Sequence, residues 1–209
     1  MTGHAPGLWV TFEGGDGSGK TTQAGLLEEW LGGLGRTVVR TREPGGTEVG
    51  MLVRDIVLHH RGEIAPRAEA LLYAADRAQH IETLVRPALA RGEVVIQDRY
   101  LDSSVAYQGA GRILDADEIR RLSLWATGGE LPDVTVLLDL DPVVARRRLD
   151  ADDKPFDRLE AEQADFHGRV RRAFLDLAAA EPGRFLVVDA TLPAADIAAT
   201  VRERISAHL

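Results

Sequence analysis

The sequence contains no cysteine, and this absence excludes disulfide bonds, thiol nucleophiles and cysteine-ligated zinc together. It also lacks an apolar run long enough to span a membrane, and residues 1–7 lack the basic start and apolar core of a secretory signal. Positive charge is scarce, because 25 Lys and Arg residues face 33 Asp and Glu, for a formal net charge of -8. We therefore expect a cytoplasmic protein that uses neither a membrane nor nucleic acid as a partner and that meets anionic ligands with local clusters of arginine.

What the sequence does have is the composition of one globular domain. Hydrophobic residues make up 44% of the chain and charged residues 28%, which is typical of folded soluble proteins. A length of 209 residues is enough to bury a sizeable core. Because no internal repeat or low-complexity linker divides the chain, we predict a single domain over residues 1–209.

The most informative stretch is rich in glycine and follows a short apolar strand. It reads Gly14, four residues, Gly19, Lys20, Thr21, which is a complete phosphate-binding loop signature. The glycines let backbone N–H groups converge on phosphate oxygens, and the helix that starts at the end of the loop adds its positive dipole end. Lys20 would bridge the β- and γ-phosphates, and Thr21 would ligate Mg²⁺. The predicted ATP-binding residues are Gly14, Gly15, Asp16, Gly17, Ser18, Gly19, Lys20, Thr21 and Thr22.

Apolar strands alternate with amphipathic helices along the rest of the chain. The patterns predict strands at 8–12, 37–41, 94–97, 134–138 and 185–188. They predict helices at 21–34, 48–58, 66–84, 115–125, from 142 onward, at about 160–180 and at 193–206, with Pro87 kinking or ending the third and a surface loop at 150–157. This alternation implies a five-stranded parallel sheet covered by helices on both faces, with ligands at the carboxyl ends of the strands.

Further motifs follow the loop in order and cover nearly the whole chain. They are Phe12-Glu13-Gly14, Arg42-Glu43-Pro44-Gly45-Gly46-Thr47, Tyr73 with Asp76 and Arg77, Asp98-Arg99-Tyr100 followed by Ser103, Ala106, Tyr107 and Gln108, Asp157-Arg158-Leu159-Glu160, and Asp189-Ala190. A phosphate-binding loop alone does not separate kinases from GTPases, motors or ligases. This ordered set, however, resembles the thymidylate kinases. The absence of arginine from the loop itself resembles the bacterial type, in which an arginine of the lid completes the site.

The resemblance implies an activity and a fold. The activity is transfer of the γ-phosphate of ATP to dTMP, giving dTDP and ADP, with Mg²⁺ as the cofactor. The fold is that of the P-loop nucleoside monophosphate kinases, an α/β fold with a five-stranded parallel sheet and a short lid, which we place at about residues 149–159. The resemblance also implies a homodimer, for which no feature of the sequence gives independent evidence.

The acceptor dTMP is assigned to a second group of residues. Arg42 stands at a strand end, where its guanidinium can grip two phosphate oxygens, and Tyr73 and Arg77 share one helix face because they are four residues apart. By resemblance, Tyr73 stacks on thymine, although phenylalanine is more usual there, and Arg77 holds the acceptor phosphate. By resemblance, Ser104 and Gln108 match positions that contact the pyrimidine, and Tyr107 would crowd a 2′-hydroxyl. The full predicted dTMP-binding set is Arg42, Tyr73, Arg77, Arg99, Ser104, Tyr107 and Gln108.

The catalytic set combines loop, strand-end and lid residues. It comprises Lys20, Asp16, Arg99, Arg158 and Arg148, and the metal-binding residues are Thr21 and Asp98. Asp98 ends a strand beside the loop and suits action on Mg²⁺ through water, while by resemblance Asp16 helps to arrange Mg²⁺ and the 3′-hydroxyl. The lid carries Asp150, Asp152 and Asp153 where further basic residues are common, so which arginine reaches the nucleotide is open.

Alternatives remain for the function and for single residues. The nearest rival is a related P-loop kinase with another nucleoside or nucleotide acceptor, and a second rival is a regulatory nucleotide-binding protein. The glycine-rich loop could be an ordinary strand-to-helix turn, Tyr73 a core residue, Arg42 a surface arginine and Asp98 a helix cap.

Overall fold

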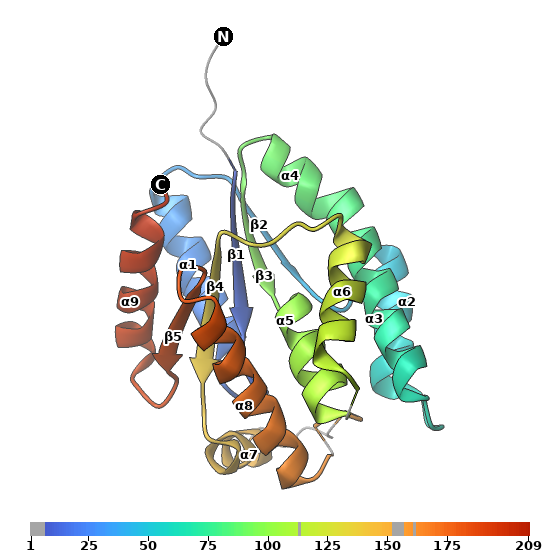
Figure 1. Cartoon of the computed structure of the whole chain (residues 1–209). Coiled ribbons are helices and arrows are strands. Elements are labelled where there is room, and N and C mark those ends of the chain that lie inside the picture. The colour runs from blue at the N-terminus through green and yellow to red at the C-terminus, as the bar shows by residue number, and fades with distance from the viewer. Residues whose placement is uncertain (1–6, 113, 152–156, 161) are drawn as a thin grey trace.

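The computed structural model in Figure 1 describes residues 7–112, 114–151, 157–160 and 162–209. Its centre is a five-stranded sheet in the order β2-β3-β1-β4-β5, and every neighbouring pair is parallel. The strands are β1 (Leu8–Glu13), β2 (Val38–Arg42), β3 (Val94–Asp98), β4 (Val134–Asp139) and β5 (Phe185–Asp189). The predicted parallel sheet is confirmed, and each strand lies within one residue of its predicted position at both ends.

Helices cover both faces of this sheet. They are α1 (Lys20–Gly33), α2 (Glu48–His59), α3 (Pro66–His80), α4 (Arg86–Ala90), α5 (Leu101–Ser104), α6 (Ala116–Thr127), α7 (Pro142–Ala151), α8 (Ala164–Ala180) and α9 (Ala194–Ser206), with π-helical segments η1 (Ile81–Val85) and η2 (Val105–Gly111). Figure 1 shows α1 and α9 together on one side and α3, α5, α6 and α8 on the other. No helix in the described parts of the chain is long and apolar enough to cross a membrane.

The central strand β1 explains how the core is divided between the two faces. All of its residues are buried, as expected for a strand with neighbours on both edges and helices on both faces. Val10 and Phe12 point into the core that α1 and α9 close, whereas Trp9 packs against Tyr100 on the opposite face, with ring centroids 4.6 Å apart. Each such side chain contributes about 1.5–3 kcal/mol on burial, so β1 ties both layers to one frame.

Of the two outcomes predicted for Pro87, a kink or an end of the helix that begins at Pro66, the end is wrong. α3 passes directly into η1 and then into α4, which ends at Ala90. In the π-helical turn the N–H of Arg86 bonds to the carbonyl of Ile81, five residues back. A wider turn of this kind relaxes the regular bonding just before a residue that has no N–H, so the helix can continue through the proline.

Two other regions differ from the predictions. Sequence patterns gave no element for residues 101–111, which form α5 and η2 and form one wall of the cavity described below. α7 extends to Ala151, so Asp150 is helical and pairs with Arg146 one turn earlier rather than belonging to a loop. α8 starts at Ala164 rather than near 160. Residues 152–156 of the predicted lid, which include Asp152 and Asp153, lie outside the described residues.

Candidate active site

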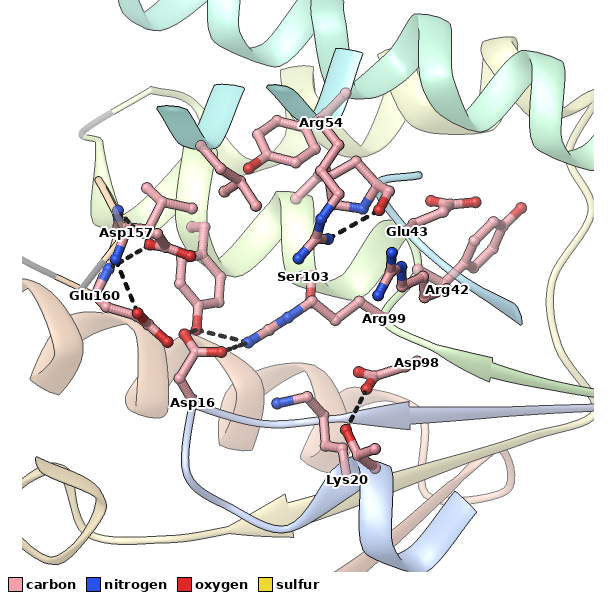
Figure 2. A pocket seen from close by; sticks show the side chains of 18 of the residues that line it. Asp16, Lys20, Arg42, Glu43, Arg54, Asp98, Arg99, Ser103, Asp157 and Glu160 are labelled. Carbon is pink, nitrogen blue, oxygen red and sulfur yellow. Dashed lines mark hydrogen bonds and ion pairs between the residues drawn. The ribbon is translucent and has the colours of Figure 1, made fainter. Parts of the chain in front are cut away.

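The carboxyl ends of β1, β2 and β3 open onto a cavity of about 460 Å³ (Figure 2). The predicted site residues that line it are Asp16, Gly17, Gly19, Lys20, Thr21, Arg42, Tyr73, Arg77, Asp98, Arg99, Ser104, Tyr107, Gln108 and Arg148. Sequence analysis did not assign a site role to several other lining residues, namely Glu43, Arg54, Ser103, Asp157 and Glu160. Positions far apart in the chain thus converge at the carboxyl ends of the strands, as the parallel topology requires.

The glycine-rich loop between β1 and α1 wraps closely around its own lysine. Gly14 has φ +131°, and a Cβ there would lie 2.5 Å from the carbonyl oxygen of Leu138, so only glycine fits. Lys20 begins α1 and donates hydrogen bonds to the carbonyl oxygens of Gly14 at 3.1 Å and Gly15 at 2.9 Å. The Oγ of Ser18 is buried without a hydrogen-bond partner among the described residues. A loop with a buried ammonium and an unpaired hydroxyl is suited to phosphate oxygens.

Asp16, Arg99 and Tyr107 form a hydrogen-bonded triangle above the loop. Figure 2 shows Arg99 directed toward Asp16. Arg99 donates to Asp16 at 2.6 Å and to the hydroxyl of Tyr107 at 3.3 Å, and that hydroxyl donates to the other Asp16 oxygen at 3.4 Å. Although burial acts in the opposite direction, Arg99 and then Lys20 lower the pKa of Asp16 to about 2. Burial, followed by the charge of Arg99, lowers the pKa of Lys20. Two cations thus crowd around one carboxylate.

Glu13 anchors the segment that carries Arg99, a role that its place in a motif did not reveal. Arg99 has φ +67°, a conformation that a side chain disfavours. Glu13 is fully buried at the end of β1 and accepts from the N–H of Tyr100 at 2.7 Å and from the hydroxyl of Ser103 at 2.5 Å. Burial and then the charge of Asp102 raise the pKa of Glu13 to about 7. The carboxyl group therefore fixes the backbone on the far side of the strained residue.

Thr21 and Asp98 lie together beside the loop. The Thr21 hydroxyl donates to an Asp98 carboxylate oxygen at 3.4 Å, which joins the start of α1 to the end of β3. Both are hard oxygen donors of the kind that Mg²⁺ prefers. No group of three or more His, Cys, Asp or Glu side chains among the described residues could hold a metal by itself. The donor set therefore fits a magnesium ion that takes its remaining ligands from phosphate and water, and Asp98 is not a helix cap.

A second cationic group lies at the opposite wall, where Arg42 and Arg54 face the cavity (Figure 2). Arg54 is held by a hydrogen bond to the carbonyl oxygen of Pro44 at 3.0 Å. Burial and then the positive charge of Arg42 lower the pKa of Arg54, which means that like charges are concentrated there. Sequence analysis missed Arg54, because it lies within α2 and outside any motif; only the packing of α2 against the turn after β2 brings it to the site.

Arg77 lines the cavity, but its guanidinium is already paired within the protein. Its guanidinium is buried, pairs with Glu43 at 2.8 Å and donates to the hydroxyls of Ser104 and Ser123, each at 3.0 Å. The charge of Arg77 is therefore already balanced by Glu43, and its contact with Ser104 directs it toward the uncharged part of the wall. Arg42 and Arg54 are better placed than Arg77 to meet an acceptor phosphate.

That uncharged part of the wall carries Tyr73, Ser104 and Gln108. All three are buried and line the cavity, with Tyr73 on α3 and the other two on α5 and η2. Burial and then the charge of Glu69 raise the pKa of the Tyr73 hydroxyl, so the ring is neutral at physiological pH. An aromatic ring beside neutral hydrogen-bonding groups is a suitable surface for a nucleobase.

The two predicted lid arginines separate in the structure. Arg148 lines the cavity and donates to the carbonyl oxygens of Gly17 at 3.3 Å and Ala190 at 2.9 Å. Arg158 does not line it; its guanidinium pairs with the buried Glu69 and donates to the carbonyl oxygen of Val57 at 2.9 Å. In this conformation Arg148 lies at the phosphate-binding loop and Arg158 contributes to the wall behind the acceptor end.

The raised pKa of Glu13 generates a prediction for stability. Between pH 4.5 and about 7 the folded protein keeps a proton on Glu13 that the unfolded chain has lost, so the free energy of unfolding falls as pH rises through this window. Glu13→Gln removes this group, and the variant should become more stable relative to wild type between pH 5 and pH 7.5, by about 2–3 kcal/mol. Urea unfolding at both pH values measures the difference; an equal effect of the substitution at both values would contradict the assignment.

Comparison with known proteins places the chain in a family. The thymidylate kinase family model matches residues 12–201. A thymidylate kinase of Leifsonia xyli is 68% identical over 204 residues, which cover 98% of this chain and 97% of the relative. A thymidylate kinase of Deinococcus radiodurans is 53% identical over 202 residues, which cover 95% of this chain and 98% of the relative. The crystal structure of thymidylate kinase from Ehrlichia chaffeensis superposes with a TM-score of 0.78 at 32% identity, covering 96% of this chain and 99% of that one. The chain belongs to the thymidylate kinase family.

Proposed function

We propose that the two ends of the cavity divide the reaction of this family member, the ATP-dependent phosphorylation of dTMP to dTDP. The phosphate-binding loop holds the donor, and the wall formed by α2, α3, α5 and η2 holds the acceptor. The observation that carries this proposal is that two pairs of cations line one cavity, Lys20 with Arg99 at the phosphate-binding loop and Arg42 with Arg54 beside the turn after β2. Such a pair of sites suits two phosphorylated substrates facing one another.

The charges explain why cations are gathered from four elements. Two unit charges about 4 Å apart repel each other by about 4 kcal/mol at an effective dielectric constant near 20, and a triphosphate must approach a monophosphate with several such pairs. Lys20 and Arg99 offset the donor's charge, and Arg42 and Arg54 offset that of the acceptor. Phosphoryl transfer then depends mainly on alignment and on stabilisation of the charge that spreads over the transferred group.

Thr21 and Asp98 would hold Mg²⁺ in this scheme. The ion supplies charge neutralisation between the β- and γ-phosphates when it is bound. Asp16 is held at the same place by Arg99 and Tyr107, and its low pKa keeps it ionised, so it can accept a hydrogen bond from a sugar hydroxyl. Tyr107 fills the space beside Asp16 and would restrict a 2′-hydroxyl there.

The thymine ring belongs against Tyr73, with Ser104 and Gln108 at its polar edge. Arg77 supports this edge through Ser104 and does not act as a phosphate ligand, which revises the role that the resemblance implied. Arg148 is the described cation best placed to reach the donor phosphates from outside the loop. Arg158 acts through Glu69 at the acceptor wall in this conformation, and its predicted catalytic role remains a prediction.

The proposal also covers the oligomeric state of the protein and its location in the cell. Three helices, α2, α3 and α6, pack side by side and expose large apolar side chains. Val49, Leu52 and Ile56 form one stripe along α2 and are 48%, 69% and 44% exposed, and Leu71 on α3 is 57% exposed. A second copy placed on this face would cover them in a two-fold dimer. A cytoplasmic location, where ATP and dTMP are available, completes the proposal.

The function is tested by measuring ADP release with a panel of nucleoside monophosphates and nucleosides. We expect dTMP to give the highest kcat/KM, and Lys20→Ala to lower kcat about 100-fold or more while the protein stays folded, because Lys20 would stabilise charge that develops on the phosphoryl group. A clear preference for another acceptor, or hydrolysis of ATP that proceeds equally well without any acceptor, would reject the proposal.

The division between donor and acceptor ends predicts opposite kinetic effects for two arginines. Arg54→Ala should raise KM for dTMP about 10- to 100-fold with little change in KM for ATP, because it removes one charged hydrogen-bond donor from the acceptor phosphate. Arg148→Ala should mainly lower kcat. Steady-state kinetics with each substrate varied in turn measures both, and the reverse pattern would exchange their roles.

The dimer face predicts a change of assembly on a single substitution. Leu52→Glu should give a monomer, because it places a charge in the centre of the apolar stripe of both copies. Light scattering coupled to size-exclusion chromatography measures the mass. The control is Leu192→Glu, which changes a 45% exposed leucine between β5 and α9 at the other edge of the sheet. A monomeric wild type, or dissociation by the control alone, would contradict the proposed face.

A further inference from the structure

Glu69 is a charged residue that neither the motifs nor the roles above explain. It lies on α3 and is completely buried. One carboxylate oxygen accepts from the side-chain amide of Gln108 at 2.9 Å and from Nε of Arg112 at 3.4 Å, and the other pairs with Arg158. Two guanidinium groups thus balance the charge of Glu69. Its only uncharged side-chain partner among the described residues is Gln108, which lines the cavity at the acceptor wall.

This contact fixes which way the Gln108 amide points. A carboxylate paired with two guanidinium groups can only accept hydrogen bonds, so it must face the NH₂ group of Gln108. Rotation of the amide by half a turn would place its oxygen against a carboxylate oxygen, which is repulsive. The Gln108 oxygen is consequently directed away from Glu69, and no hydrogen bond reaches it within the described parts of the chain, although the residue is only 2% exposed. The cavity is the remaining side to which this acceptor can turn.

The neighbouring group has a defined polarity as well. Ser104 Oγ accepts a hydrogen bond from Arg77 at 3.0 Å, and Arg77 is itself held by Glu43. The hydroxyl hydrogen of Ser104 is therefore free to be donated into the cavity. The wall presents an acceptor from Gln108 next to a donor from Ser104. The complementary ligand edge is an N–H beside a carbonyl oxygen, which is the N3–O4 edge of thymine and uracil.

We propose that Glu69 is a positioning residue that selects the pyrimidine by locking the Gln108 amide with its oxygen toward the base. Cytosine presents a bare ring nitrogen at N3 and an amino group at C4, so its N3 would face the Gln108 oxygen without a hydrogen between them. An amide free to rotate could turn its NH₂ group toward that nitrogen and accept cytosine. Glu69 removes this freedom. The inference rests on the proposed placement of the base against Tyr73 and adds to it a reason for rejecting cytosine.

The test uses Glu69→Gln in the full-length enzyme and three acceptors, dTMP, dUMP and dCMP. A glutamine of the same size can offer Gln108 either an oxygen or an NH₂ group, so the lock is lost. We expect the ratio of kcat/KM for dTMP over dCMP to fall about 10-fold or more, because cytosine N3 no longer faces a buried acceptor without a hydrogen bond. The ratio for dTMP over dUMP should not change, because the two bases share the N3–O4 edge. Equal loss with all three acceptors would show general loosening and overturn the proposal.

Two further variants separate the lock from a structural role. Gln108→Leu should itself reduce the preference for dTMP over dCMP, and adding Glu69→Gln to it should change that ratio no further; a second fall would show that Glu69 acts by another route. Glu162→Gln is the matched control, because Glu162 also pairs with Arg112 but does not contact Gln108, and it should leave the ratio unchanged. A reduced ratio in this control would overturn the proposal.

If Glu69→Gln does not fold, Glu69→Asp takes its place. Aspartate keeps the charge for both arginines but withdraws its oxygens from the Gln108 amide by one methylene group, and it should lower the dTMP over dCMP ratio without altering the dTMP over dUMP ratio. An unchanged dTMP over dCMP ratio in a folded variant would reject the role of Glu69. Wild type that does not phosphorylate dTMP would instead reject the proposed function, which the same assay reveals before any variant is compared.

Discussion

The site depends on one constraint, the mutual repulsion of the cations gathered at the carboxyl ends of the strands. These cations are Lys20, Arg99, Arg42 and Arg54. Cations this close must be held by neighbouring groups that leave some of their N–H donors available for phosphate oxygens. The clearest example is Asp16 in the phosphate-binding loop, where Arg99 and then Lys20 lower its pKa to about 2 although burial acts in the opposite direction. Arg99 and Lys20 are balanced in this way, whereas Arg54 is held by the carbonyl oxygen of Pro44.

Glu13, Glu43 and Glu69 form a second, more deeply buried layer of carboxylates, of which Glu43 lines the cavity. Glu13 holds the backbone after Arg99, Glu43 holds Arg77, and Glu69 holds Gln108 and Arg158. All three are buried and hydrogen-bonded; Glu43 and Glu69 are also paired with guanidinium groups, whereas burial and then the charge of Asp102 raise the pKa of Glu13 to about 7. This second layer makes the site rigid, because Arg99, Arg77 and Gln108 are each oriented by a buried carboxyl group.

The motif residues were predictable from the sequence because their chemistry depends on local spacing. Gly14, Gly19, Lys20 and Thr21 act within one loop, and Asp98 and Arg99 follow one strand, so a linear pattern contains the information. Arg54 and Glu69 could not be found in this way. Each lies within a helix where charged residues are ordinary, and only the approach of that helix to a neighbouring element gives it a role. Arg77 shows the opposite case, in which a motif residue was found but its role depended on Glu43 beside it.

The sequence by itself determined the fold class, the five strands, the phosphate-binding loop and the family, because alternating apolar periods and fixed motif spacings are properties of the linear chain. The tertiary structure decided which groups share charge and hydrogen bonds. It turned residues 101–111 into a helical wall, carried the helix through Pro87, separated Arg148 from Arg158 and directed the amide of Gln108. The continuation through Pro87 follows from a local π-helical turn, whereas the other outcomes depend on contacts between residues distant in the chain, whose energy is not expressed in any local pattern.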